Sequence, residues 1–337
     1  MKLSLNNYDK IIFDMDGVIT AEMAYWETAA LSCYDLLFSY EYYGHSGIDE
    51  EWCRRKYREI YDIILCGGRT VQAVKRLGVN TNWDLAYVVF CVSRYVNPEL
   101  DTLDSTHFES VCMFIENIQV APPELYDMLG GLAATTFTEY DESHFKRGGD
   151  FLWKYLNNIF DKWYHGTADF EGVKTDEELL FAAEDIKAVL EKLKAKGIRL
   201  GIGTGRPRAE IEYPLENCGI NDYFDKNMYV TLDEVNEAEK ELKLSYPLVK
   251  PDPFVFLKAA LGEKHTNKEI QEGDYTYEEL ERTLVVGDAA SDMLSAQKGG
   301  FDFAAVLTGA EGKSARKFFE DNGVKYILDD FLEFGNL

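Results

Sequence analysis

Two aspartates, Asp14 and Asp16, lie in the segment DMDG, at the end of an apolar run that begins at residue 11. Two carboxylates this close repel each other unless a cation or a shared proton relieves the repulsion, so the pair suits a Mg²⁺ site. Gly17 allows the backbone turn that would direct both side chains into one pocket. An acidic turn that only ends a strand fits the segment equally well when it is taken alone.

A second segment, GIGTGRP, covers residues 201–207 and contains Thr204 and Gly205. The Thr204 hydroxyl and the open N–H of Gly205 could bind an anion at the start of a helix, where Pro207 is a favoured first residue. An ordinary turn between a strand and a helix has the same composition. The segment is therefore a candidate phosphate site only in combination with the others.

A third segment, KPDP, places Lys250 directly before Pro251. A residue before proline is biased away from helical conformation, so Lys250 is expected on a stiff loop from which its ammonium can reach a phosphate. Asp252 can cap the helix that follows. A lysine considered in isolation is more often a solvated surface residue than a ligand.

A fourth segment, GDAASD, contains Asp288 and Asp292, which are four positions apart. Their location after another apolar run suits a hard cation that prefers oxygen ligands. The alternative is that Ser291 or Asp292 caps the next helix, and Asp292 could serve both purposes.

The apolar runs before these segments alternate with helical patterns, which predicts a parallel sheet joined by right-handed crossovers. Because parallel strands place their carboxyl ends at one edge of such a sheet, the four segments are expected to meet there. A long amphipathic helix, 176–195, should end at Gly197, which can adopt a positive φ. The five predicted strands cover residues 11–14, 198–203, 228–231, 284–287 and 303–307.

The stretch from residue 21 to residue 170 contains no comparable β pattern and has helical periodicity instead. This contrast predicts two domains: an α/β domain of residues 1–20 and 171–337, and an inserted helical domain of residues 21–170. The polar stretches 233–243 and 262–282 are expected to be solvated excursions from the α/β domain. The predicted helices of the insertion cover residues 22–39, 50–65, 71–77, 84–96, 105–118 and 151–163.

Composition and charge argue against several classes of protein. The 337 residues carry 35 Lys and Arg against 60 Asp and Glu, a net charge of -25, which argues against nucleic acid and an anionic membrane surface as partners. No apolar run reaches the roughly 18 to 20 residues of a membrane helix, and the start lacks signal-peptide features, so we expect a cytoplasmic protein. The six cysteines are isolated in sequence, which favours reduced, buried thiols over a zinc site or disulfides.

Together the four segments resemble the motifs of the haloacid dehalogenase-like superfamily, and more closely those of its phosphatase branch, which includes phosphoglycolate phosphatases and β-phosphoglucomutase-like proteins. The matching motifs are DMDGV, GIGTGRP, the lysine of VKPDP, and GDAASD, and the resemblance covers residues 8–20 and 171–335. It implies a Rossmann-like parallel sheet of order 5-4-1-2-3. It also implies that the helical insertion after the first strand is a cap domain, here larger than the common version.

The resemblance further implies a mechanism. Asp14 would be the nucleophile that forms an aspartyl phosphate, and Asp16 would protonate the leaving group and then activate water. Mg²⁺ would be held by Asp14, by Asp16 through its backbone carbonyl, and by Asp288. Asp292 would complete the outer shell of the metal or orient the phosphate-binding lysine.

The same resemblance assigns phosphate binding to Thr204, the Gly205 N–H and Lys250, whose positive charge would offset the repulsion between a carboxylate and a phosphate. The chain is thus expected to be a Mg²⁺-dependent phosphomonoester hydrolase that acts on a small phosphorylated metabolite. A sugar phosphomutase of the β-phosphoglucomutase type is one alternative. A non-catalytic module that binds a phospho-ligand or a protein is another.

The candidates for substrate selection in the insertion are Tyr25, Trp26 and Arg69, together with Lys75 and Arg76. Trp26 stands where β-phosphoglucomutases carry a histidine, which favours hydrolysis over mutase chemistry. Arg69 follows two glycines and could contact an anionic group. For each of these residues, an aromatic core or a solvated surface is the more common role.

Overall fold

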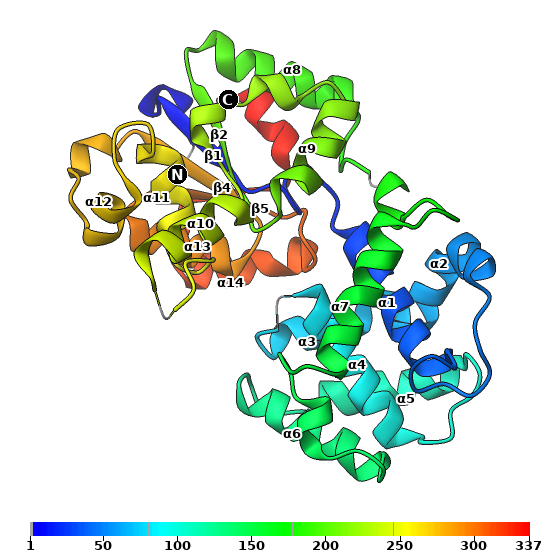
Figure 1. The fold of residues 1–337 in the computed structure, drawn as a ribbon. Coiled ribbons are helices and arrows are strands. Elements are labelled where there is room, and N and C mark those ends of the chain that lie inside the picture. Colours follow the sequence, from blue (N-terminus) through cyan, green and yellow to red (C-terminus); the bar gives the residue numbers. More distant parts are fainter. Residues whose placement is uncertain (1–2, 80, 177, 245) are drawn as a thin grey trace. The chain divides into compact units, whose positions relative to one another are not determined.

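The computed structural model describes residues 3–79, 81–176, 178–244 and 246–337. The chain forms two compact units (Figure 1). The sheet unit combines Met1–Glu22 with Glu178–Leu337, and the helical unit comprises Met23–Glu177. The chain therefore leaves the sheet unit after its first strand and returns to it for all the others.

A parallel sheet with the strand order β3-β2-β1-β4-β5-β6 forms the centre of the sheet unit. The predicted α/β class is confirmed, and the five predicted strands occur in the predicted order, 5-4-1-2-3, counted from the opposite edge. The order differs in one detail, because a sixth strand extends the sheet beyond β5. Its three residues are too few to produce a recognisable apolar run. The strands are β1 (Lys10–Phe13), β2 (Arg199–Gly203), β3 (Tyr229–Val230), β4 (Thr283–Gly287), β5 (Asp302–Val306) and β6 (Tyr326–Leu328).

Helices cover both faces of this sheet, because neighbouring residues of each central strand are apolar and point to opposite sides. Ile11 and Phe13 of β1 share a buried cluster with Leu190 of α8. Ile12 belongs to the cluster on the other face, together with Phe256 of α11. The helices of this unit are α8 (Ala183–Ala195), α9 (Arg208–Asn217), α10 (Leu232–Leu242), α11 (Phe254–Leu261), α12 (Asn267–Glu272), α13 (Ala290–Gly299) and α14 (Ala315–Asp321).

Two polar stretches of the sheet unit, which are largely solvated as expected, also contain helices. Residues 233–243 belong largely to helix α10, whose start is fixed by a capping box between Thr231 and Glu234. Residues 262–282 contain the short helix α12. The long helix expected from residue 176 begins only at Ala183, although it ends as predicted before Gly197, which has a φ of 80°.

The helical unit is organised around α4, in which residues 84–94 are all buried. The sequence predicted six of the seven α-helices in the described part of this unit and missed α6. That helix contains two glycines and two threonines, which are weak helix formers. The helices are α1 (Met23–Phe38), α2 (Glu50–Ile64), α3 (Arg69–Arg76), α4 (Asn82–Val96), α5 (Ser105–Glu116), α6 (Glu124–Thr136) and α7 (Leu152–His165).

A buried arginine joins three parts of the helical unit. Arg94 of α4 is fully buried. Its guanidinium donates hydrogen bonds to four backbone carbonyls, which belong to the end of α1, the turn after it and the loop after α4. These acceptors are the carbonyl oxygens of Leu37, Tyr43, Pro98 and Leu100. The guanidinium therefore satisfies carbonyls that would otherwise lack partners in a dry interior.

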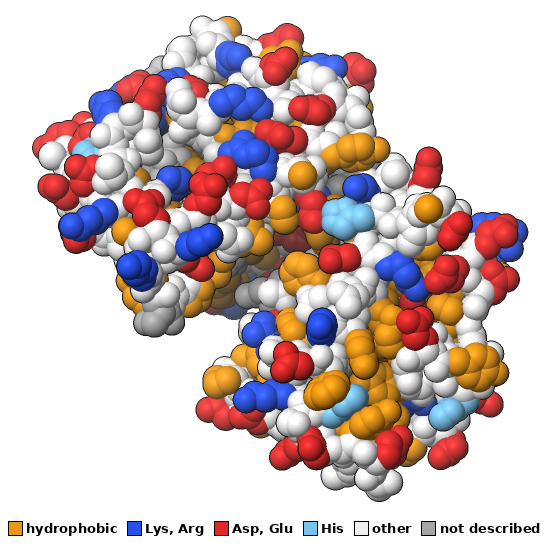
Figure 2. Space-filling model, in the orientation of Figure 1, with side chains coloured by type: hydrophobic (Ala, Val, Ile, Leu, Met, Phe, Trp, Pro, Cys, Tyr) orange, Lys and Arg blue, Asp and Glu red, His pale blue; other side chains and the backbone are white. Residues whose placement is uncertain are grey.

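Acidic and basic side chains are interspersed on the face of each unit that Figure 2 shows. Among the described residues, no helix has both the length and the apolar character needed to cross a membrane. All six cysteines are free thiols. Four of them are buried as predicted, whereas Cys66 and Cys218 are only partly buried.

Candidate active site

The candidate site lies at the carboxyl edge of the sheet, where the three adjacent strands β2, β1 and β4 end. Phe13, the last residue of β1, is in register with Ile202 on one side and with Val286 on the other. Asp14 follows directly, and its N–H donates to the Val286 carbonyl at 2.8 Å. Thr204 and Asp288 come directly after β2 and β4. The parallel register therefore brings the ends of three of the four sequence segments to one edge.

The fourth segment contributes Lys250, which bridges two buried carboxylates. Its ammonium lies 2.8 Å from Oδ1 of Asp14 and 2.7 Å from Oδ1 of Asp292. The ring of Phe256 lies 4.8 Å from the same ammonium and covers it with an aromatic face. One cation thus serves two acids in a place largely closed to water.

Burial and neighbouring charges act on these groups in opposite directions. Burial raises the pKa of the Asp14 carboxyl, and the nearby Lys250 ammonium opposes that rise. Burial alone would lower the pKa of Lys250, but the charges of Asp14 and Asp292 outweigh it and raise the pKa. Lys250 is therefore charged at neutral pH.

Three aspartates at this edge form a cluster that fits a divalent cation. Asp14, Asp288 and Asp292 each offer one oxygen, and the three oxygens lie within 4.8 Å of one another. They are hard oxygen donors, which matches the preference of Mg²⁺. The side chain of Asp16 is not a member of this cluster. Its predicted contribution to a metal site was its backbone carbonyl.

Glycine is required where the backbone approaches Asp288. A Cβ atom on Gly309 would lie only 1.7 Å from Oδ2 of Asp288, and one on Gly17 would lie 2.5 Å from it. Gly17 also has a φ of 73°, which favours glycine. These two glycines hold the backbone close around one carboxylate and so limit the positions that it can adopt.

Asp16 is oriented by two donors. Nη1 of Arg206 lies 3.1 Å from Oδ1 of Asp16, and the Thr20 hydroxyl donates to the same oxygen at 2.9 Å. The Arg206 side chain is only 4% exposed. From the sequence we predicted no role for this arginine, although it stands inside GIGTGRP. The residue type could have indicated a role, because an arginine is rarely buried without an anionic partner.

The loop after β2 holds the two predicted phosphate-binding residues. The N–H of Thr204 donates to the Val230 carbonyl at 3.0 Å, and its hydroxyl accepts the Arg206 N–H at 3.2 Å. Gly205 is exposed, and a Cβ atom there would meet open space. Nothing in the surrounding packing therefore blocks the backbone at Gly205.

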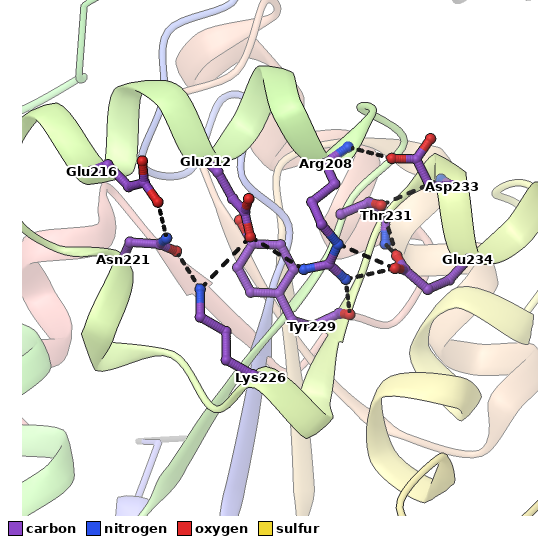
Figure 3. Close-up of polar contacts among 9 residues, drawn as sticks. All are labelled: Arg208, Glu212, Glu216, Asn221, Lys226, Tyr229, Thr231, Asp233 and Glu234. Carbon is purple, nitrogen blue, oxygen red and sulfur yellow. Dashed lines mark hydrogen bonds and ion pairs between the residues drawn. The ribbon is translucent and has the colours of Figure 1, made fainter.

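An ionic network anchors the helix that follows this loop (Figure 3). Nη2 of Arg208, the first residue of α9, donates to Oε1 of Glu234 at 2.6 Å and to the Tyr229 carbonyl at 3.1 Å. The N–H of Arg208 donates to Asp233 at 2.9 Å. The start of α9 is thus tied to β3 and to the start of α10, which fixes one end of the loop that carries Thr204.

Two aromatic candidates belong to the helical unit, at the start of α1. Tyr25 and Trp26 are each only 7% exposed. Tyr25 stacks on Tyr164 with ring centroids 4.8 Å apart, and the ammonium of Lys75 lies 4.6 Å from the Trp26 ring. Both rings are therefore part of the packing of the helical unit.

Arg69 also lies in the helical unit, at the first residue of α3. Its Nη2 lies 2.7 Å from Oε2 of Glu109, and its Nε lies 3.2 Å from Oε1 of Glu116. Two carboxylates thus already offset the charge of this guanidinium. An anionic substrate group would have to compete with these carboxylates for the guanidinium.

Comparisons with known proteins agree with this architecture. The family model described as haloacid dehalogenase-like hydrolase matches residues 8–300. A protein named Pyrophosphatase PpaX from Bacillus cereus (strain AH820) is 23% identical over 239 residues, which cover 68% of this chain and 90% of the relative. A protein of the same name from Bacillus anthracis (strain CDC 684 / NRRL 3495) is 25% identical over 237 residues, with the same coverage.

A crystal structure determined as Northeast Structural Genomics Consortium target ZR25 is 28% identical. It matches with a TM-score of 0.78 and covers 97% of each chain. The family match spans well over half of the sequence and includes β1, β2, β4, the four aspartates and Lys250. The chain belongs to the haloacid dehalogenase-like hydrolases.

Proposed function

We propose that this hydrolase is a Mg²⁺-dependent phosphatase that cleaves phosphomonoesters of small metabolites through an aspartyl-phosphate intermediate. The observation that carries the proposal is the position of the Lys250 ammonium between Asp14 and Asp292, beside the third carboxylate of Asp288. A phosphate dianion can approach a carboxylate nucleophile only where positive charge offsets their repulsion. Lys250 supplies part of this charge.

We propose Asp14, the backbone carbonyl of Asp16, and Asp288 as the residues that hold the metal, with Asp292 in its outer shell. When bound, Mg²⁺ would neutralise negative charge on the phosphoryl oxygens. The fit rests on three carboxylate oxygens within 4.8 Å of one another, which are the hard donors that Mg²⁺ prefers.

In the proposed reaction, a carboxylate oxygen of Asp14 attacks phosphorus, and the bond from phosphorus to the leaving oxygen breaks. Asp16 gives a proton to that leaving oxygen. Asp16 then takes a proton from the water that attacks phosphorus, so that phosphate leaves and the Asp14 carboxylate is restored. Arg206 and Thr20 support this role by holding Oδ1 of Asp16 in one place.

Thr204, the Gly205 N–H and Lys250 are the groups that we propose to bind the phosphoryl oxygens. The buried position of Thr204 and the open space at Gly205 support this assignment. The anchoring of α9 through Arg208 also supports it, because it fixes one end of the loop that carries both residues.

A phosphoanhydride such as inorganic pyrophosphate is a second candidate substrate. Two relatives carry the name pyrophosphatase. The guanidinium of Arg206 also lies beside Asp16, the residue next to the leaving group in the proposed reaction. A leaving phosphate carries negative charge that a guanidinium recognises well.

The test is an activity assay with p-nitrophenyl phosphate, a panel of phosphorylated metabolites and pyrophosphate, each with Mg²⁺ and with EDTA. We expect turnover that requires the metal and is lost in Asp14→Asn. Asp222→Asn, which changes an exposed aspartate of the sheet unit, is the matched control and should keep full activity. Mass spectrometry after acid quenching should detect phosphate on the peptide that contains Asp14.

Other outcomes would favour the alternatives. Turnover that survives both EDTA and Asp14→Asn would refute the proposed mechanism. Isomerisation of a sugar phosphate that depends on a bisphosphate would favour a phosphomutase. Binding of phosphorylated ligands without turnover would favour a non-catalytic module.

A further inference from the structure

A cavity of about 410 Å³ lies in the helical unit and has no part in the chemistry proposed above. It is formed by the turn after α1, by the segment 139–144 and by the beginning of α7. Its size falls within the range of small-molecule sites. Six of its ten lining residues carry rings, namely five tyrosines and phenylalanines and His144. Three others are acidic.

Stacked rings build one wall of this cavity. The His144 ring lies between Tyr140, with centroids 4.0 Å apart, and Phe151, with centroids 4.7 Å apart. The Tyr43 hydroxyl is hydrogen-bonded to Nε2 of His144 at 2.8 Å, which locks the buried histidine in place. Tyr140 and Phe151 are 39% and 45% exposed, so each keeps aromatic surface open to a ligand. The wall is rigid at its centre and accessible at both ends.

Tyr42 and Tyr155 add a second pair of rings, with centroids 5.5 Å apart and planes inclined by 51°. The stacked wall and this second group of rings thus offer aromatic surface from different segments of the chain. Each ring face carries the negative part of an aromatic quadrupole, which attracts cations.

The charges around the cavity also favour a cation. Glu41, Glu139 and Asp141 line it, and none of the described lining residues is a lysine or an arginine. Burial lowers the pKa of His144, and the charges of Asp141 and Glu139 only partly oppose that effect, so the ring is neutral at pH 7. The cavity therefore combines a negative rim with aromatic faces, and its described lining carries no lysine or arginine to attract an anion.

We propose that this cavity binds a small organic cation of the alkylammonium class. The aromatic faces would contact the alkyl groups around the nitrogen, and the three carboxylates would balance its charge. A bare metal ion fits less well, because it needs several converging oxygen ligands, whereas six of the ten lining residues present rings. The proposal is independent of the phosphatase mechanism, since none of these residues belongs to the sheet unit.

Ligand-observed NMR with the full-length protein tests the proposal, with choline as the probe and 3,3-dimethylbutan-1-ol as its uncharged analogue of the same shape. We expect saturable binding of choline and at least about tenfold weaker binding of the analogue, the effect of about 1.4 kcal/mol of cation recognition. Equal affinity for the two probes would overturn the proposal. So would the absence of saturable choline binding at the solubility limit of the protein.

Two variants locate the binding. Tyr140→Leu keeps apolar volume but removes an exposed ring face, and Glu139→Gln removes one rim charge; each should weaken choline binding several-fold. The matched controls are Tyr277→Leu and Glu278→Gln, which change an exposed tyrosine and an exposed glutamate of the sheet unit. Thermal unfolding checks that all four variants fold. Choline affinity that is unchanged in both folded cavity variants, or equally reduced in the controls, would contradict the assignment.

Discussion

The ammonium of Lys250 lies 2.8 Å from a carboxylate oxygen of Asp14, although the two residues are 236 positions apart in the sequence. The same ammonium contacts Asp292 at 2.7 Å. Both aspartates are buried, so Lys250 is the protein's own compensation for two closely placed negative charges. Removing Lys250 should lower the reaction rate more than removing any other single cation of the sheet unit.

Lys250→Met should lower kcat/KM by about 100-fold or more, because it removes positive charge from the place where negative charge gathers in the transition state. The measurement is steady-state kinetics with saturating Mg²⁺. Lys240→Met changes an exposed lysine of α10 and should leave the rate unchanged. A Lys250→Met protein that folds and retains full activity would rule out this role for the lysine.

Mg²⁺ should raise the thermal unfolding midpoint, because a ligand that binds only the folded state stabilises it. At 100 times its Kd, the ion would contribute about 2.7 kcal/mol, or a shift of about 5 °C or more for a domain of this size. Asp288→Asn should lose most of this shift, since it removes one of the three clustered oxygens. Asp222→Asn should preserve it. A shift of equal size in both variants would show that the ion binds elsewhere.

Glu234 should make stability depend on pH through the network that anchors α9. Burial alone would raise the pKa of Glu234, but hydrogen bonds from Arg208 and Thr231 outweigh it and hold the pKa below its usual value. A lowered pKa in the folded state contributes stability above the unfolded pKa of about 4.3, and this contribution is lost as the pH falls through the folded value.

The difference in unfolding free energy between the wild type and Glu234→Gln should therefore be largest near neutral pH and shrink below about pH 4. Urea unfolding at pH 7 and at pH 3.5 measures it. Glu278→Gln, at an exposed site, should show little difference at either pH. A Glu234→Gln effect that grows on acidification would contradict the assigned direction.

Arg94→Met should strongly destabilise the helical unit. The substitution keeps apolar volume but leaves four carbonyl oxygens without their donor, in a site where the arginine is fully buried. We expect a loss of about 3–5 kcal/mol, because each buried acceptor left without a donor costs about 1–3 kcal/mol. Arg55→Met, at an exposed position of α2, should change the unfolding free energy by less than about 0.5 kcal/mol. Equal effects in urea unfolding would refute the structural role of Arg94.

The sequence alone was sufficient for the elements that carry a strong local signal. The apolar run before Asp14 and the run before Asp288 predicted β1 and β4, because a buried parallel strand is apolar on both faces. The alternation of strands with helices then predicted a parallel sheet whose strand ends share one edge. The placement of Asp14, Thr204 and Asp288 directly after strands could be foreseen for this reason.

Tertiary structure decided which distant side chains meet. Arg206 beside Asp16, Arg94 among four carbonyls and the rings around His144 leave no periodic pattern in the sequence. Periodicity reports only whether a position is buried within its own helix or strand. The partner of a buried charge or ring depends on how separate elements pack, and that packing is determined by the whole chain rather than by any one segment.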